Sequence, residues 1–393
     1  MTMRRSPVRM TLATPILIGA IGWVGVVMIG LQLAAASADS LGFDLELLLQ
    51  AGREIAAGRS PYAPGLIGGS APTATSLFYS YPPPVGQAMV PFAGVPSTVM
   101  LTAWGVLAVG GLLLVTDGLR RRLAPERRRA EVLAVVAAAA PLTLPFAVGL
   151  LFGNVDVFFP LFYGAMLVAV LAPSRGTAIA GGAGLVLASL KIHPISMGLW
   201  FLVRSLKGRQ AGPGRVLGIA VVIGVAIAGA SVGFGGTSVW ADYAQVVRSG
   251  TNAIVVDPRN AGIAATLAGL LGGDDGLARG LHLAIGVAAV VLTGWAAWRR
   301  DDPLESFAWA TAASLSTLPV TWYHYPSAMI PVAIAAGLRA PVAARRRVGW
   351  AVVAAGIVAA VAIAWLPLLW LAIGLVIVAA RWSRAEVPAR ASG

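Results

Sequence analysis

Polar side chains that could carry out acid–base or anion-binding chemistry stand in short turns between long apolar segments. Asp44 supplies a carboxylate that can accept a proton, and Lys191 and His324 supply groups that can hold an anion. Ionisable groups beside apolar, membrane-like segments are costly and mark functional sites more often than packing. The candidates of this kind are Asp44, Tyr81, Asn154, Asp156, Lys191, His193, Arg259 and His324.

Asp44 lies in the longest polar interruption of the N-terminal third, residues 38–84. A polar loop of this length usually has a functional reason. The residue stands at the start of a predicted helix that runs to about residue 57, so two interpretations remain open. Asp44 is either a general base or the N-cap of its own helix, a position that favours aspartate. Glu46 is the nearest alternative carboxylate, but a spacing of two residues places it on another helical face.

The candidate anion ligands follow helix breaks. Lys191 and His193 precede a proline, and a broken helix there would direct free backbone N–H groups toward an anion. The alternative is that Lys191 extends to a membrane interface. His324, between two tyrosines, is either an anion ligand or part of an aromatic belt. Arg259, followed by Asn260, is a further candidate for a phosphate or acceptor contact.

The composition indicates the elements that must position these residues. The 393-residue chain is 58% hydrophobic and 11% charged, whereas a soluble domain carries roughly 25% charged residues. This composition predicts an all-α polytopic membrane protein. Cysteine is absent, which excludes disulfides and a cysteine nucleophile. The three histidines lack zinc-ligand spacing and no nucleotide-binding loop occurs, so we expect no cofactor and no metal site, although metal dependence stays open.

The basic residues are distributed unevenly along the chain. Arginines gather at the N-terminus and in alternate loops, including 120–122, 127–129 and 345–347. By the positive-inside rule these loops and both termini are cytoplasmic, which places the candidate residues on the external face. We therefore expect a multi-pass protein of a bacterial inner membrane. The net charge of +13 reflects this orientation in a lipid bilayer and not nucleic-acid binding.

The apolar pattern predicts about twelve transmembrane helices in one domain over residues 1–380, with a cytoplasmic tail at 381–393. The first external loop, 38–84, should carry short juxtamembrane helices, and the second external loop spans 235–279. Segment 85–118 should begin with a short dipping piece, and 177–203 should be two short helices broken at Lys191. The predicted segments are 12–36, 85–118, 131–150, 156–172, 177–203, 216–234, 281–298, 305–320, 327–338, 348–364 and 367–380.

Five stretches carry a family resemblance through their residues and their order. They read FDLELLLQAGREIAAGRSPY, YSYPPPVGQAMVPFAGVPS, FGNVDVFFPLFYGAMLVA, SLKIHPISMGLWFLVRSL and LSTLPVTWYHYPSAMIPVAIA. Over about residues 10–340 the chain resembles glycosyltransferase family 87, bacterial membrane enzymes of the GT-C fold. The resemblance implies a polyprenyl-phosphate sugar as the donor, with mannose as the leading sugar, and a glycolipid or lipoglycan acceptor.

The resemblance also implies roles for individual residues. The family's Asp-Leu pair after the first span, whose aspartate is the base, corresponds to Asp44-Leu45. A polar turn of the family corresponds to residues 153–156, and its late Trp-x-His element to residues 322–324. The residues expected to hold the donor phosphate are His324, Lys191, His193 and Arg259. The residues expected to contact the sugar or the acceptor are Glu46, Tyr62, Tyr81, Asn154, Asp156 and Tyr323.

The sequence thus favours an inverting glycosyltransferase that needs a base, a phosphate site and a groove for a lipid tail. One alternative within the same fold is an arabinofuranosyltransferase. A different class, a lipid or solute transporter or flippase, would place ionisable residues at the membrane midplane within an inverted repeat, whereas here they lie in external turns. A non-catalytic scaffold is the third hypothesis. We expect Asp44 and His324 to line one cavity.

Overall fold

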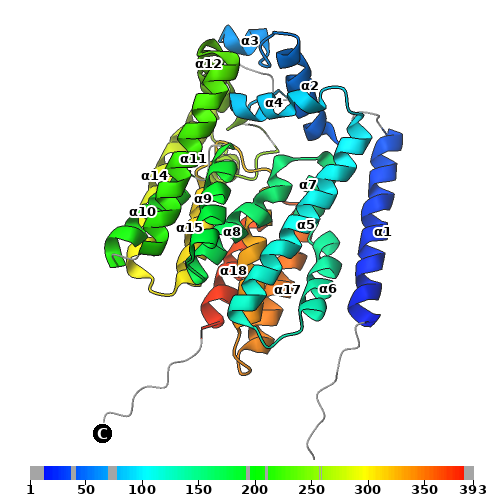
Figure 1. Ribbon diagram of the computed structural model, residues 1–393, viewed down its shortest axis with the longest axis vertical. Helices are drawn as coiled ribbons and strands as arrows, with labels where there is room; N and C mark the ends of the chain where they lie inside the picture. Colours follow the sequence, from blue (N-terminus) through cyan, green and yellow to red (C-terminus); the bar gives the residue numbers. More distant parts are fainter. Residues whose placement is uncertain are drawn as a thin grey trace, which may run out of the picture.

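The computed structural model describes residues 13–36, 41–69, 78–191, 195–208, 211–255, 257 and 259–384. Within these residues every regular element is helical and no strand is present, as the composition predicted (Figure 1). Most helices run roughly parallel to the long axis of the molecule, and a few short ones cover one end. The tail at residues 385–393 lies outside the described residues.

The helical elements alternate with short turns along the whole chain. In order they are α1 (Ala13–Ala36), α2 (Phe43–Ala56), α3 (Pro64–Ile67), α4 (Pro83–Met89), η1 (Val90–Phe92), α5 (Ser97–Leu123), α6 (Arg129–Ala139), η2 (Ala140–Leu142), α7 (Leu144–Phe152), η3 (Val155–Phe158), α8 (Phe159–Leu171), α9 (Arg175–Ser189), α10 (Ile195–Gly208), α11 (Ala211–Gly235), α12 (Ser238–Ile254), α13 (Ile263–Leu270), α14 (Asp275–Arg299), α15 (Pro303–Ser316), η4 (Tyr325–Met329), α16 (Ile330–Arg339), α17 (Arg345–Val361) and α18 (Leu368–Trp382).

Each apolar segment predicted from the sequence contains a helix or a pair of helices. The segment predicted at 131–150 is divided between α6 and α7, which meet at an angle of 72°. Pro141 and Pro145 flank this bend, and proline removes helix hydrogen bonds. The segment predicted at 177–203 is two helices, α9 and α10, with Lys191 between them as expected.

Three helices in the described part of the chain, α5, α11 and α14, are long and apolar enough to cross a membrane, and the bent α6–α7 pair would add a fourth. Large apolar side chains on these helices face outward. Leu114 on α5 and Val222 on α11 are each 68% exposed, as expected for surfaces that contact lipid. The structure is therefore that of a membrane protein, and the expected number of about twelve spans stays a prediction.

Small residues allow the central helices to approach closely. The main core lies among α8, α10, α15, α16 and α18, where the fully buried rings of Trp200 and Phe307 meet edge to face at 5.5 Å. A Cβ atom on Gly184 of α9 would lie 2.6 Å from the carbonyl oxygen of Phe162 on α8. The glycine-rich piece at 181–184 is thus a helix contact, a common device in membrane bundles.

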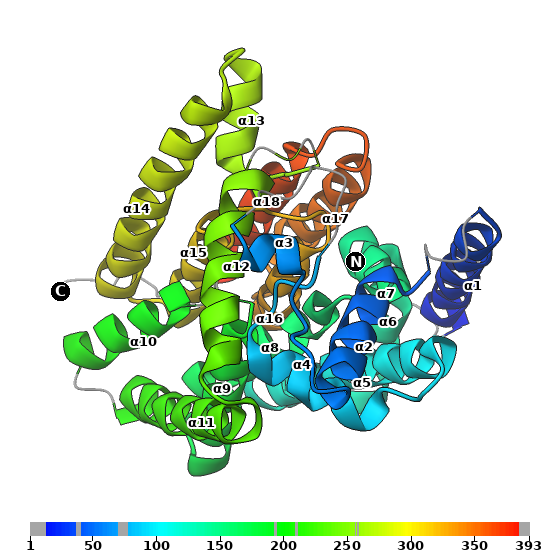
Figure 2. The same ribbon diagram turned by 90° about the horizontal axis from the view of Figure 1, so that it is seen from above.

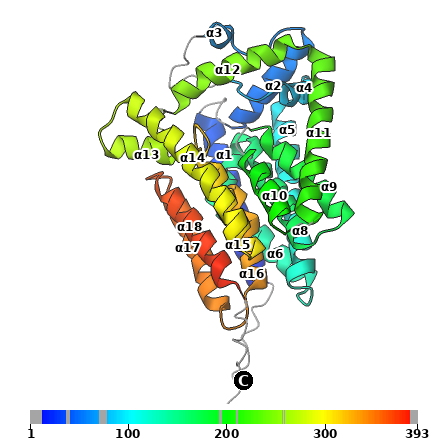
Figure 3. The same ribbon diagram turned by 90° about the vertical axis from the view of Figure 1, so that its left-hand side faces the viewer.

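One end of the bundle is covered by α2, α3, α4 and α12, which we call the cap (Figures 1 and 3). The cap has its own core, which includes Leu45, Leu48 and Tyr62 of the first polar loop and Val246 of α12. Seen from the cap end, α1 lies at one edge beside α6, while α13 and the start of α14 project from the other side (Figure 2). The predicted short helices of the 38–84 loop are therefore packed parts of the fold.

The opposite end of the bundle carries the arginine-rich turn between α5 and α6 (Figure 1). Asp117, 2% exposed, is ion-paired with Arg120 at 3.0 Å, with Arg129 at 3.3 Å and with Arg121. These arginines lie at the far end of α5 from the cap. The cap, whose helix α2 contains Asp44, and this arginine-rich turn thus occupy different ends of the molecule.

Candidate functional site

Asp44 lies in the first turn of α2 but does not cap it. The N-cap is Gly42, in the left-handed conformation with φ of 70°, and no side chain caps the helix. The N-cap interpretation of Asp44 is therefore wrong. Its Oδ2 atom instead accepts a hydrogen bond of 2.7 Å from the side-chain amide of Asn154. The Asp44 side chain is thus hydrogen-bonded to the turn after α7.

The turn that supplies Asn154 is pressed against α2. Gly153 ends α7 with φ of 66°, and a Cβ atom there would lie 2.6 Å from the Cβ of Leu45. The Oδ1 atom of Asn154 accepts from the backbone N–H of Asp156 at 3.0 Å, and its carbonyl accepts from the Trp104 indole at 3.1 Å. These contacts hold the Asn154 side-chain amide in the orientation in which it donates to Asp44.

Lys191 connects this turn to the rest of the site. Its Nζ donates to Oδ1 of Asn154 at 2.9 Å and to Oδ2 of Asp156 at 2.7 Å. The same ammonium lies 5.2 Å from the ring centre of Tyr81 and 4.7 Å from that of Tyr325. With only 13% of the side chain exposed, Lys191 points into the protein instead of extending to an interface. His193 lies outside the described residues.

Asp156 and His324 complete the group. Asp156 is fully buried, and its Oδ2 lies 3.1 Å from Nε2 of His324. Ser327 donates to the Asp156 carbonyl at 3.1 Å and fixes this turn to the entry of α16. Among the described residues, Oδ1 of Asp156 and Nε2 of His324 are buried without a hydrogen-bond partner. Such atoms are uncommon, and a bound ligand is one explanation for them.

We refer to Asp44, Asn154, Lys191, Asp156 and His324 as the Asp44–His324 cluster. Its members come from the start of α2, the α7–η3 turn, η3 itself, the α9–α10 break and the turn before η4. Two carboxylates, one ammonium and one imidazole thus meet at the cap end of the bundle. Such a group can accept a proton at one position and hold an anion at another.

Tyr81 lies against the cluster as a neutral phenol. Burial raises the pKa of Tyr81 well above its ordinary value of 10.0, and the carboxylates of Asp156 and Asp44 raise it further. The hydroxyl group therefore keeps its proton at physiological pH. The sequence indicated Tyr81 but not Tyr325, whose buried ring has its centre 4.7 Å from the Lys191 ammonium. The only available signal for Tyr325 was its position directly after His324.

The other predicted contact residues have partners of their own. Glu46 is ion-paired with Arg53 on the exposed face of α2. The hydroxyl of Tyr62, a residue 2% exposed, donates to the Tyr81 carbonyl at 2.9 Å, and that of Tyr323 donates to the Ala359 carbonyl at 2.5 Å. Of these three side chains, only that of Tyr62 contacts a neighbour of the cluster, the backbone of Tyr81.

Arg259 lies in the loop between α12 and α13. Its guanidinium donates to both oxygens of Asp257, at 3.0 and 2.7 Å, and its Cζ lies 5.4 Å from the ring centre of Trp322. Burial tends to raise the pKa of Asp257, but the hydrogen bonds from Arg259 outweigh it and hold this pKa below the ordinary value of 3.8. Arg259 is thus placed beside the segment that leads to His324, with its charge already paired.

Within the described ranges, no three His, Asp or Glu side chains are grouped so that they could hold a metal ion.

Comparison with known proteins identifies the family. The model of glycosyltransferase family 87 matches residues 79–321, more than half of the chain. The matched range contains Tyr81, Asn154, Asp156, Lys191 and Arg259, whereas Asp44 and His324 lie outside it. No curated protein and no solved structure matches the chain. The chain therefore belongs to glycosyltransferase family 87 and is a membrane glycosyltransferase.

Proposed function

We propose that the protein transfers a sugar, with mannose as the leading candidate, from a polyprenyl-phosphate donor to a glycolipid or lipoglycan acceptor, with inversion at the anomeric carbon. One observation carries the proposal. A carboxylate from α2 is hydrogen-bonded into a buried group that also holds an ammonium and an imidazole. A base beside an anion site is the arrangement that transfer from a sugar phosphate requires.

In the proposed reaction, Asp44 is the general base. An acceptor hydroxyl oxygen attacks the anomeric carbon and forms the new glycosidic bond. The bond from that carbon to the phosphate oxygen breaks, and its electron pair leaves with the phosphate. The hydroxyl proton passes to the Asp44 carboxylate. No general acid is needed, because a phosphate departs as an anion, in contrast to the paired carboxylates of glycosidases.

Lys191 and His324 are proposed to hold the leaving phosphate. Two of the three N–H groups of Lys191 are directed to Asn154 and Asp156, so one donor remains for a phosphate oxygen. Nε2 of His324, which lies 3.1 Å from Oδ2 of Asp156, is proposed as a second donor when the ring is protonated. Asp156 fixes both groups from one side. His193 and Arg259 are proposed as further phosphate contacts, with Arg259 having to release part of its pairing with Asp257.

The remaining contacts and the orientation are part of the same proposal. Tyr81, Asn154 and Asp156 are proposed to contact the sugar. Glu46, Tyr62 and Tyr323 are proposed as more distant contacts of the sugar or the acceptor. We propose that the cluster faces the outside of a bacterial inner membrane, with both termini in the cytoplasm. The positive-inside rule supports this orientation, because the cluster lies at the end of the bundle away from the arginine-rich α5–α6 turn. The architecture proposed is a GT-C fold of about twelve spans.

Transfer by purified protein tests the role of Asp44. The protein would be supplied with polyprenyl-phosphate mannose and a glycolipid acceptor, and wild type compared with Asp44→Asn. Loss of the base should lower kcat by about 10²- to 10⁴-fold while donor affinity changes little. Asp242→Asn is the matched control, because Asp242 is a cap carboxylate that accepts from Ser60 at 2.8 Å, outside the cluster.

Two outcomes would change the assignment. Equal transfer by wild type and Asp44→Asn would remove Asp44 as the base. Faster transfer from polyprenyl-phosphate arabinose than from the mannose donor would replace mannose with a pentose as the transferred sugar.

A further inference from the structure

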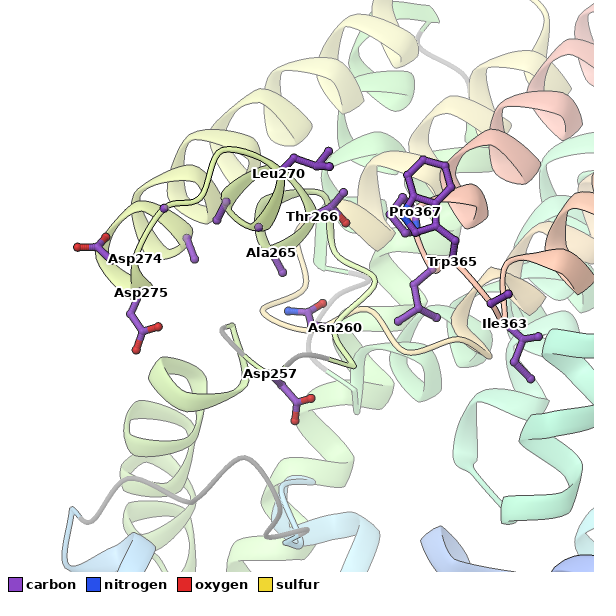
Figure 4. A pocket seen from close by; sticks show the side chains of 16 residues that line it. Asp257, Asn260, Ala265, Thr266, Leu270, Asp274, Asp275, Ile363, Trp365 and Pro367 are labelled. Atoms are coloured by element: carbon purple, nitrogen blue, oxygen red, sulfur yellow. The ribbon is translucent and has the colours of Figure 1, made fainter.

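A second feature of the molecule is a hollow that shares no residue with the Asp44–His324 cluster. It has a volume of about 630 Å³ and lies between α13, the start of α14 and the turn that joins α17 to α18 (Figure 4). This volume is within the range of small-ligand sites, roughly 300–1,000 Å³. We call it the α13 hollow.

The two sides of the α13 hollow differ in chemistry. Asp274 and Asp275 lie on one side, Trp365 and Ile363 lie on the other, and Asn260 lies between them (Figure 4). The apolar side is open to the surroundings, since Ile363 is 63% and Trp365 56% exposed. A ligand there would meet carboxylates at one end and an aromatic and aliphatic surface at the other, which suits an amphipathic molecule.

The polar side favours hydroxyl groups over a phosphate. The lining contains three carboxylates, from Asp257, Asp274 and Asp275, and no lysine or arginine among the described residues. Carboxylates accept hydrogen bonds from sugar hydroxyls but repel an anion. The nearby cations already face these acids, because Arg259 pairs with Asp257 and the Arg279 guanidinium lies 3.7 Å from Asp275.

Asn260, which lines the hollow, is hydrogen-bonded to the segment that carries His324. Asn260 donates to the carbonyl oxygens of Val255 at 3.1 Å and Pro319 at 2.9 Å, and its Oδ1 accepts from the backbone N–H of Thr321 at 2.9 Å. His324 follows Thr321 by three residues, a distance of at most about 11 Å for extended chain. One lining residue of the hollow is thus hydrogen-bonded to the same segment that carries His324.

We propose that the α13 hollow binds the acceptor: an uncharged sugar or polyol headgroup carried on a lipid, with its hydroxyls toward the aspartates and its lipid-proximal part against Trp365 and Ile363. This inference rests on the proposed glycosyl transfer and names the place from which the attacking hydroxyl arrives. The donor, which carries a phosphate, is excluded from the hollow by the acidic lining.

Filling the hollow tests the proposal. Gly269 of α13 lines it, and a Cβ atom at this position meets nothing within 4 Å, so Gly269→Phe places a ring in the hollow without a backbone clash. Gly280→Phe on α14 is the matched control, since its Cβ also meets nothing within 4 Å and it does not line the hollow. Hexyl α-mannoside is the probe, titrated calorimetrically into protein in lipid nanodiscs. Gly269→Phe should weaken its affinity at least about tenfold, because the ring occupies its space, and Gly280→Phe should leave it unchanged.

A second variant changes charge without filling space. Asp275→Asn should also weaken hexyl mannoside binding, while Asp301→Asn, at a carboxylate 85% exposed in the α14–α15 turn outside the hollow, should not. Equal mannoside affinity in wild type, Gly269→Phe and Asp275→Asn would overturn the proposal. The proposal would also be overturned if Gly269→Phe lost affinity for polyprenyl-phosphate mannose and kept its affinity for the mannoside.

The same proteins separate this inference from the proposed function. Mannoside binding that depends on Gly269, without any sugar transfer by wild type, would support the hollow as a sugar site and refute the proposed function. Transfer by wild type with mannoside affinity insensitive to Gly269 and Asp275 would support the function and refute the hollow as the acceptor site.

Discussion

The contact between Gly153 and Leu45 predicts how the candidate base is positioned. A Cβ atom at residue 153 would lie 2.6 Å from the Leu45 Cβ, whereas ordinary contacts begin near 3.4 Å. Gly153→Ala must therefore displace the start of α2 from the α7–η3 turn by about 1 Å. That displacement acts directly on the 2.7 Å hydrogen bond between Asn154 and Asp44. A shift of about 1 Å in a catalytic group can cost roughly 10²-fold in rate, so kcat should fall by this order.

A matched glycine separates the clash from backbone strain. Gly58 at the end of α2 has φ of 72°, against 66° for Gly153, but its Cβ would meet nothing within 4 Å. Gly58→Ala should cost only the left-handed strain, about 1–2 kcal/mol. Gly153→Ala should cost that strain plus about 1–3 kcal/mol of overpacking. Free energies of unfolding in mixed micelles and transfer rates measure the two effects.

The positioning of Asp44 by the α7–η3 turn is tested by the rate of sugar transfer and not by stability. If Gly153→Ala and Gly58→Ala transferred sugar at the same rate, the α7–η3 turn would not position Asp44. A lower kcat in Gly153→Ala with unchanged donor affinity is the expected pattern, because the phosphate contacts come from other elements.

Two further predictions concern paired charges. Lys191→Met leaves the fully buried Asp156 carboxylate without its ammonium partner and should lower the free energy of unfolding by about 3–5 kcal/mol. The double variant Lys191→Met, Asp156→Asn should recover a large part of this loss, because the unpaired charge is removed. If unfolding measurements gave additive losses for the two substitutions, the pairing would be contradicted. The pKa of Asp257 is lowered in the folded protein, so the stability that this carboxylate provides is present above its unfolded pKa, near 3.8, and is lost as pH falls through the lower folded value. Asp257→Asn should therefore be less stable than wild type at neutral pH and should lose less stability on acidification below about pH 4. If the free energies of unfolding of wild type and Asp257→Asn changed in parallel with pH, the stabilising role of the Asp257–Arg259 pair would be refuted.

The helices and their breaks could be predicted because their signals are local. The apolar runs and the prolines around residues 82–84, 141 and 145 specify where a chain can and cannot continue a helix. The predicted segments therefore match the observed helices closely, and the α9–α10 break falls at Lys191 as expected. The 72° bend between α6 and α7 was not predicted, because the apolar pattern alone does not give the angle at a break.

The choice between carboxylates required the structure. Asp44 and Glu46 are two residues apart, and the sequence could say only that they occupy different faces of the helix. Packing turned Asp44 toward Asn154, a residue 110 positions away, and left Glu46 with Arg53 on the exposed face. The N-cap interpretation failed for a similar reason, since Gly42 adopts a left-handed conformation that places the helix start before Asp44.

By itself, the sequence determined a helical membrane protein, the order of its segments and a short list of polar residues in turns, because each of these depends on composition and on neighbours a few positions apart. Only the tertiary structure decided which of those residues meet. The Asp44–His324 cluster joins four turns through hydrogen bonds of 2.7–2.9 Å and one 3.1 Å contact, while Arg259 is paired with Asp257 and Tyr323 is bound to α17. Apart from the local pair of Arg259 and Asp257, these contacts depend on the approach of segments distant in sequence, which local patterns do not encode.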